Sequence, residues 1–127
     1  MHHRGSYYYL ICSTGNYAKG GTYKLVVGRS DKILGPYVDK TGADMKKVKH
    51  ELVLEGDSVF SSPGHCSRII TDDAGRDWIL YHAYTQTGTY RMLMLDRIEW
   101  DEDGWPYVPD RHPSLNAEFG PYFESGN

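Results

Sequence analysis

The sequence predicts an all-β protein. Eleven Tyr and three Trp occur among 127 residues, and aromatic residues are enriched in β-strands. They lie in short runs separated by turns that contain glycine or proline, a pattern typical of strands joined by hairpins. With 39% hydrophobic and 24% charged residues, the chain has the composition of a globular domain that can bury a core.

The chain also contains two copies of one strand pattern. Equivalent segments recur at a nearly constant separation, which is typical of architectures whose units bury their faces against neighbouring units. Two unrelated meanders with common turn residues are the alternative interpretation. The matching segments are 5–12 with 75–82, 23–27 with 90–94, and 35–38 with 104–108.

We interpret the two copies as four-stranded antiparallel blades of a β-propeller, packed face to face. The blade units span about 5–58 and 59–110, and an irregular tail follows at 111–127. Two blades do not close a ring, so we expect open apolar faces at both ends, which favours self-association or a second polypeptide. The residues expected on these faces include Leu25, Val27, Met92 and Met94.

In the first unit, strands are expected at 6–12 and 23–30. The segment 13–22 between them is polar and glycine-rich, and it is too long for a tight hairpin. Residues 40–50 carry several lysines and are expected to form a solvated surface connection, before a further strand at 51–55.

In the second unit, residues 66–71 and 77–84 are expected to form a hairpin across the turn at 73–75. Residues 90–100 have apolar side chains at odd and at even positions. This pattern predicts a strand that is buried on much of both faces. Residues 105–108 form a short outer strand, because proline at position 106 suits an edge.

Several classes of protein are disfavoured by composition. A net charge of −3 with mixed signs leaves no electrostatic footprint for nucleic acid or acidic membranes. No apolar run approaches the roughly 20 residues of a membrane span, and residues 1–5 have no signal-peptide core. Cys12 and Cys66 can form one bridge or remain free buried thiols, of which we favour free thiols.

The chain resembles the C-terminal part of glycoside hydrolase family 43, most closely its arabinan endo-1,5-α-L-arabinosidases (endo-arabinanases). The order and spacing of six motifs over about a hundred residues carry this resemblance. The motifs are Tyr-Tyr-Tyr-Leu at 7–10, Tyr-Lys-Leu-Val-Val-Gly-Arg-Ser at 23–30, Gly-Pro-Tyr-Val-Asp-Lys at 35–40, Pro-Gly-His at 63–65, Tyr-His-Ala-Tyr at 81–84, and Trp-Asp-Glu-Asp-Gly-Trp-Pro at 100–106.

The resemblance implies a five-bladed propeller that hydrolyses α-1,5-linked arabinan with inversion. One carboxyl group protonates the leaving oxygen while another activates water on the opposite face of the sugar. The family's general-base Asp, tuning Asp and general-acid Glu are all expected before residue 1, so no catalytic residue is assigned here. Glu55 and Asp57 precede the Pro-Gly-His motif and approach the expected channel mouth, but no second carboxyl group is placed with them across a sugar.

His65 is the candidate metal ligand. The resemblance implies that this histidine points into the central channel and holds calcium in a water-rich shell. Calcium prefers six to eight oxygen ligands, so one imidazole with waters is an unusual site. The alternative is a buried histidine that bonds the backbone of the channel wall, and His82 is expected to be a satisfied core histidine.

The segment 13–22 holds the candidate substrate-binding residues. Tyr17 is a candidate for stacking on a sugar ring, because an aromatic face covers the apolar face of a sugar. Ser13, Thr14 and Asn16 are candidates for hydrogen-bonding sugar hydroxyls, because their side chains carry donors and acceptors. The competing interpretation is a loop capped by its own polar side chains.

Three functional classes remain open. The chain is the C-terminal part of an arabinan hydrolase that is active only when N-terminal blades complete it, or a non-catalytic carbohydrate-binding remnant, or a truncated product without activity of its own. By resemblance, the expected substrate is arabinan and the expected location is secreted or periplasmic. No nucleic-acid or membrane partner is expected.

Overall fold

The computed structural model describes residues 1–116 and 119–125. The first sheet has the strand order β1-β2-β3-β4, and every neighbouring pair is antiparallel. A short 3-10 helix, η1, precedes β4. The bounds are His2–Arg4 for β1, Tyr7–Thr14 for β2, Lys24–Ser30 for β3, Met45–Lys47 for η1 and Glu51–Leu54 for β4.

The second sheet has the order β5-β7-β8-β9, with β6 also paired to β7. Because β8 occupies one edge of β7, β5 and β6 share the other edge and together take the place of one broken strand. The bounds are Phe60–Gly64 for β5, Ile70–Thr71 for β6, Asp77–Thr85 for β7, Arg91–Trp100 for β8, Pro106–Tyr107 for β9 and Pro109–Arg111 for the 3-10 helix η2.

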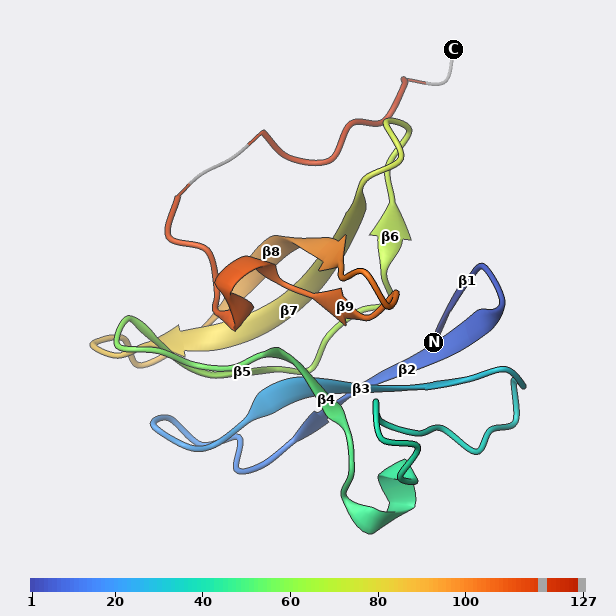
Figure 1. The fold of residues 1–127 in the computed structure, drawn as a ribbon. Coiled ribbons are helices and arrows are strands. Elements are labelled where there is room, and N and C mark those ends of the chain that lie inside the picture. The colour runs from blue at the N-terminus through green and yellow to red at the C-terminus, as the bar shows by residue number, and fades with distance from the viewer. Residues whose placement is uncertain (117–118, 126–127) are drawn as a thin grey trace.

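The all-β fold of two antiparallel, blade-like sheets is therefore confirmed (Figure 1). The repeat is visible in the pairing, since Arg29 bridges Val38 in the first sheet as Glu99 pairs with Tyr107 in the second. Within the described residues, neither short helix has the length and apolarity needed to cross a membrane.

The hydrophobic core lies between the two sheets. Tyr9 and Leu25 from the first sheet belong to the same cluster as Ile79, Tyr81 and Ala83 from the second. The expectation that Leu25 and Val27 line an open face is wrong, because both have 0% relative exposure. They lie within the contact between the sheets, and the faces left open are elsewhere.

Burial of β8 on both faces is also contradicted over its first half. Met92 and Leu93 are 46% and 75% exposed, and Leu95 is 39% exposed. Met94 packs against the core, and Ile98 belongs to it. Alternate residues of a strand point to opposite faces, so Leu93 and Leu95 lie on the face turned away from the core.

The expected strand at 66–71 is shorter than predicted. Only Ile70–Thr71 pairs with β7, as strand β6. His65 has a φ of 56°, which interrupts the extended backbone after β5. Ser67 replaces part of the ladder, because its N–H donates to the Leu80 carbonyl at 2.8 Å and its Oγ accepts from the Leu80 N–H at 3.2 Å.

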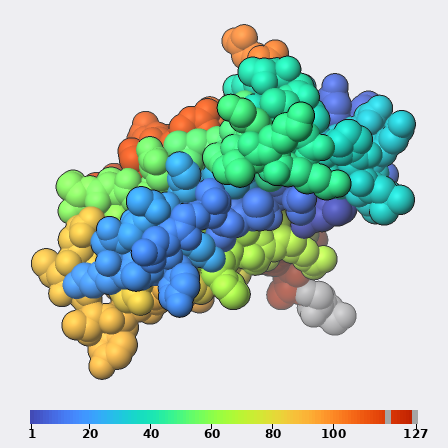
Figure 2. All heavy atoms as spheres, turned by 90° about the horizontal axis from the view of Figure 1, so that it is seen from below, coloured from blue at the N-terminus to red at the C-terminus, as the bar shows by residue number. Residues whose placement is uncertain are grey.

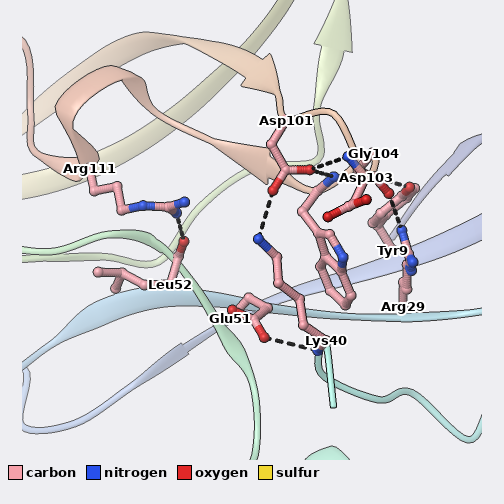
Figure 3. Close-up of polar contacts among 10 residues, drawn as sticks. Tyr9, Arg29, Lys40, Glu51, Leu52, Asp101, Asp103, Gly104 and Arg111 are labelled. Carbon is pink, nitrogen blue, oxygen red and sulfur yellow. Dashed lines mark hydrogen bonds and ion pairs between the residues drawn. The ribbon is translucent and has the colours of Figure 1, made fainter. Parts of the chain in front are cut away.

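Polar contacts tie the turn before β9 to the first sheet (Figure 3). The Tyr9 hydroxyl donates to the Gly104 carbonyl at 2.6 Å, and Arg29 Nη1 donates to the Asp103 carbonyl at 2.6 Å. Lys40 Nζ lies 2.7 Å from Asp101 Oδ2. The guanidinium of Arg29 also lies 4.4 Å from the ring centroid of Trp105. One end of the contact between the blades is therefore held by hydrogen bonds and ring contacts as well as by the core.

The C-terminal segment crosses the second sheet on the side away from the first sheet (Figure 1). The buried Asp72 carboxylate holds it there, since Oδ2 accepts the Tyr122 N–H at 3.1 Å and the Trp78 indole N–H at 3.0 Å. Burial raises the pKa of Asp72, but the N–H groups of Arg76, Tyr122 and Trp78 outweigh it and hold the pKa well below its usual range. Residues 117–118 and 126–127 of the expected irregular tail lie outside the described residues.

Candidate functional site

Most of the residues singled out in the sequence lie at one end of the contact between the blades. There the last residues of β2 meet the end of β5, the last third of β7 and the start of β8. The loop 15–22 of the first sheet lies beside the connection between β7 and β8, as the neighbouring blue and gold atoms in Figure 2 show.

His65 follows the last residue of β5 and is exposed. Its left-handed backbone conformation, with a φ of 56°, is uncommon for a residue with a side chain and costs on the order of 1 kcal/mol. The His65 N–H donates to Ser13 Oγ at 2.8 Å, which joins the two blades. The His65 backbone is therefore fixed while its imidazole stays accessible to solvent.

His82 is not the core histidine that strand alternation suggested. Its ring stacks on that of His65, with centroids 5.1 Å apart and an interplanar angle of 23°. His82 Nδ1 lies 3.1 Å from Nη1 of Arg91. A guanidinium only donates, so Nδ1 accepts and the proton of neutral His82 is on Nε2. Burial, followed by the charge of Arg91, lowers the pKa of His82.

Arg91, the first residue of β8, is the centre of this end. Nη1 donates to the Ser62 carbonyl at 2.9 Å and to the His82 carbonyl at 3.3 Å, and Nη2 donates to the Tyr17 carbonyl. The guanidinium lies 4.6 Å from the ring centroid of Tyr84. One cation thus binds backbone from β5, from β7 and from the loop of the other blade.

Gly64 allows the two blades to approach closely here. A Cβ at this position would lie 1.9 Å from Cε2 of the Tyr23 ring. The Tyr23 ring therefore occupies the space that any other side chain at position 64 needs. This close contact lies next to His65 in the chain.

The candidate sugar-binding residues of the loop have separate environments. Tyr17 is 70% exposed, and its ring meets Tyr23 edge-on with centroids 6.4 Å apart. Asn16 Oδ1 accepts the Ala18 N–H at 2.9 Å, and Ser13 Oγ accepts from His65. Thr14 ends β2, opposite Lys24. Asn16 and Ser13 therefore stabilise local structure, while the Asn16 amide and the Ser13 hydroxyl each keep a hydrogen that can be donated to a ligand.

As a metal site, this cluster supplies one accessible imidazole. Among residues 1–116 and 119–125, no group of three or more His, Cys, Asp or Glu side chains is placed to hold an ion. Among these residues, His65 is therefore a candidate for a single ligand and not part of a preformed set of several. The Arg91 cation next to His82 makes a two-histidine site unfavourable for a positive ion.

The other chemistry considered in the sequence is accounted for locally. Asp57 Oδ1 accepts the N–H groups of Val59 at 2.7 Å and Phe60 at 2.8 Å, so it caps the turn into β5. Cys12 and Cys66 are free thiols, as favoured. Burial raises the pKa of both.

Sequence reasoning missed Arg91 and Ser62 as parts of this site. Arg91 occupies an ordinary alternating position at the start of a strand, and its partners are mostly backbone carbonyls, which leave no pattern in a sequence. The repeat offers one signal that could have pointed to Arg91. Arg91 matches Lys24 in the first copy, and Lys24 lies opposite Thr14 at the same end of the first sheet.

Comparison with known proteins defines the class of protein. The family model for glycosyl hydrolases family 43 matches residues 1–106. The chain is therefore a member of glycoside hydrolase family 43.

Two of the matching relatives are named as an arabinofuranosidase and an arabinanase. The chain is 40% identical over 111 residues to the extracellular exo-α-(1→5)-L-arabinofuranosidase of Cellvibrio japonicus, covering 85% of this chain and 31% of that protein. It is 32% identical over 108 residues to extracellular endo-α-(1→5)-L-arabinanase 1 of Bacillus subtilis, covering 82% and 31%. The chain thus spans about a third of the length of these relatives.

Solved structures agree. The α-L-arabinanase of Cellvibrio cellulosa matches with a TM-score of 0.78 and 42% identity, over 84% of this chain and 34% of that one. The same protein in complex with arabinohexaose gives a TM-score of 0.77. The endo-arabinanase of Bacillus licheniformis gives 0.73 at 31% identity, over 84% of this chain and 36% of that one. The fold is therefore that of two blades of the family's five-bladed propeller.

Proposed function

We propose that this chain forms the C-terminal blades of an inverting arabinan hydrolase, which cleaves α-1,5-arabinofuranosyl links when N-terminal blades complete the ring. The supporting observation is the similarity to arabinan-acting enzymes over 85% of the chain. The site residues support this proposal, because Ser13, His65 and Tyr17 are linked through His82 and Arg91 at one end of the contact between the two blades.

The proposed roles follow from the geometry. His65 presents an imidazole on a fixed backbone to the region that we assign to the channel. Ser13, Thr14 and Asn16 offer hydrogen-bonding groups beside it, and Tyr17 offers an exposed ring. The acid and base carboxyl groups that inversion requires belong to the N-terminal blades in this proposal.

The direct test is a fusion. The blades of the Cellvibrio japonicus relative that precede its matching region are joined to this chain, and reducing-sugar release from linear arabinan is measured for the fusion and for the 127-residue chain. We expect activity from the fusion only, with inversion at the anomeric carbon seen by NMR. A folded but inactive fusion contradicts the proposal, as does an active isolated chain that loses activity when one of its own carboxylates is replaced.

Calcium is a separate part of this proposal. His65 would contribute one ligand, and a bound ion would supply fixed positive charge to the site. We expect His65→Ala to lower the calcium content of the dialysed fusion, measured by mass spectrometry of the metal. His112→Ala serves as the matched control, because His112 directly follows η2, with its Nδ1 3.1 Å from the Glu55 carbonyl. Equal calcium in the His65 variant and the unmodified fusion removes His65 as a ligand.

The same fusion separates the carbohydrate-binding alternative. That alternative gains support from the exposed ring of Tyr17. A fusion that binds arabinohexaose without hydrolysing it establishes the binding function in place of the enzymatic one.

A further inference from the structure

The loop 15–22 of the first blade is held by side chains of the second blade. Ser62 Oγ accepts the Gly21 N–H at 3.0 Å and donates to the Ala18 carbonyl at 2.5 Å. Ser61 Oγ accepts the Gly20 N–H at 3.3 Å. Ser61 and Ser62 are both buried, with relative exposures of 5% and 1%. A surface loop of this length is ordinarily mobile, but here the neighbouring blade satisfies its backbone groups.

Arg91 completes this attachment at Tyr17, which is exposed. Its Nη2 donates to the Tyr17 carbonyl while its Nη1 donates to the Ser62 carbonyl at 2.9 Å. The guanidinium also lies over the rings of Tyr84, at 4.6 Å, and Tyr23, at 5.6 Å. The planar donor fork of arginine bonds two carbonyls at once and stacks on aromatic faces, which a lysine ammonium does not reproduce.

The consequence concerns Tyr17. The peptide group between Tyr17 and Ala18 is fixed at both of its polar atoms, by Arg91 at the Tyr17 carbonyl and by Asn16 Oδ1 at the Ala18 N–H. The Tyr17 side chain is nevertheless 70% exposed and touches Tyr23 only edge-on, so a ring face is open. An aromatic ring that is ordered before binding avoids the entropic cost of ordering it on binding.

We propose that Arg91 and Ser62 are positioning residues, which fix the loop 15–22 as one wall of the candidate site and hold the ring of Tyr17 as a stacking platform for an arabinofuranose unit. This proposal rests on the proposed function for the nature of the ligand. Its structural part, the anchoring of a first-blade loop by second-blade side chains, does not depend on catalysis.

Trypsin tests the anchoring. Lys19 is exposed within the loop, and Lys47, exposed in η1, is an internal reference in the same blade. In Arg91→Ala and Ser62→Ala we expect the ratio of cleavage at Lys19 to cleavage at Lys47 to rise about tenfold, because each loses hydrogen bonds that close the loop. Arg91→Lys should give an intermediate ratio. Arg68→Ala, which removes an exposed arginine between β5 and β6, is the matched control and should leave the ratio unchanged.

A general loss of stability raises cleavage at both lysines, so the ratio separates anchoring from destabilisation. An unchanged ratio in Arg91→Ala and Ser62→Ala overturns the anchoring. An equal rise in the Arg68→Ala control also overturns it.

Arabinohexaose tests the platform. The sugar is titrated into the 127-residue chain while the tyrosine ring signals are followed by NMR. We expect Tyr17→Ala to weaken binding without changing the cleavage ratio, Arg91→Ala to change both, and Arg91→Lys to restore part of each. No binding by the unmodified chain, or unchanged affinity in either alanine variant, overturns the platform. An inactive fusion with these results intact contradicts only the proposed catalytic function.

Discussion

Replacing Gly64 by Ala tests how closely the blades approach at the candidate site. The added Cβ would lie 1.9 Å from Cε2 and 2.1 Å from Cδ2 of Tyr23, far inside the contact distance of about 3.5–4.0 Å between carbon atoms. The ring cannot simply rotate away, because Arg91 and Tyr17 pack around it. Either the ring or strand β5 must move.

Overpacking of this kind costs about 1–3 kcal/mol, and the directness of the clash favours the upper half of that range. The free energy of unfolding is measured by urea denaturation. Gly120→Ala is the control, because a Cβ at Gly120 meets nothing within 4 Å and its φ is not positive. Surface changes of that kind stay within about 0.5 kcal/mol.

A second background identifies the cause. If the clash with the ring carries the effect, Gly64→Ala should cost clearly less in a Tyr23→Ala chain, with an interaction energy of about 0.5–3 kcal/mol. A loss of stability in Gly64→Ala no larger than that of Gly120→Ala, or an identical loss in both backgrounds, would refute the close packing of the blades at this point.

Three further predictions concern buried and half-buried groups. Asp72→Asn should lower the stability of the fold near neutral pH and make stability less dependent on pH in acid. The native carboxylate has a depressed pKa, so it stabilises the fold above its unfolded pKa of about 3.9, and this stabilisation is lost as pH falls through the native pKa. Unfolding followed by circular dichroism at a series of pH values measures the difference. Tyr81→Phe should cost about 1–3 kcal/mol in urea unfolding, because the Tyr81 hydroxyl donates to the buried Asp96 carboxylate at 2.5 Å; an unchanged midpoint contradicts this. Cys12 and Cys66, whose pKa values burial raises, should react with a disulfide reagent at pH 7 more slowly than a free thiol, and reaction as fast as glutathione counts against their burial.

The sequence predicts the blades well because strand alternation and turn residues are local signals. Residues 24–30 and 77–85 are strands almost as expected, and the repeat anticipates that β2 and β3 match β7 and β8. The sequence around a strand does not show which neighbouring sheet covers each of its faces. Leu25 and Val27 belong to an apolar run that is typical of any buried strand. Only the arrangement of the two sheets shows that they lie between them.

The candidate site was predicted only in part for the same reason. His65 stood out within a motif, but its left-handed φ breaks the alternation from which neighbouring residues were placed. Counting along one strand places His82 in the core, whereas the ring of His65, from the segment after β5, lies against it. Arg91 acts on carbonyl oxygens of residues far away in the chain, and such contacts depend on the packed fold.

Arg29 and Arg91 join the blades near opposite ends of β3, each by donating to a carbonyl of the other blade and by stacking on rings. Neither sheet can then open at one end without releasing a cation from its partners there. Amide hydrogens in β3 and in β7 should therefore exchange with solvent through a single opening of common free energy, as one cooperative unit. The pair of blades, and not the single repeat, is then the smallest part of this chain that unfolds on its own.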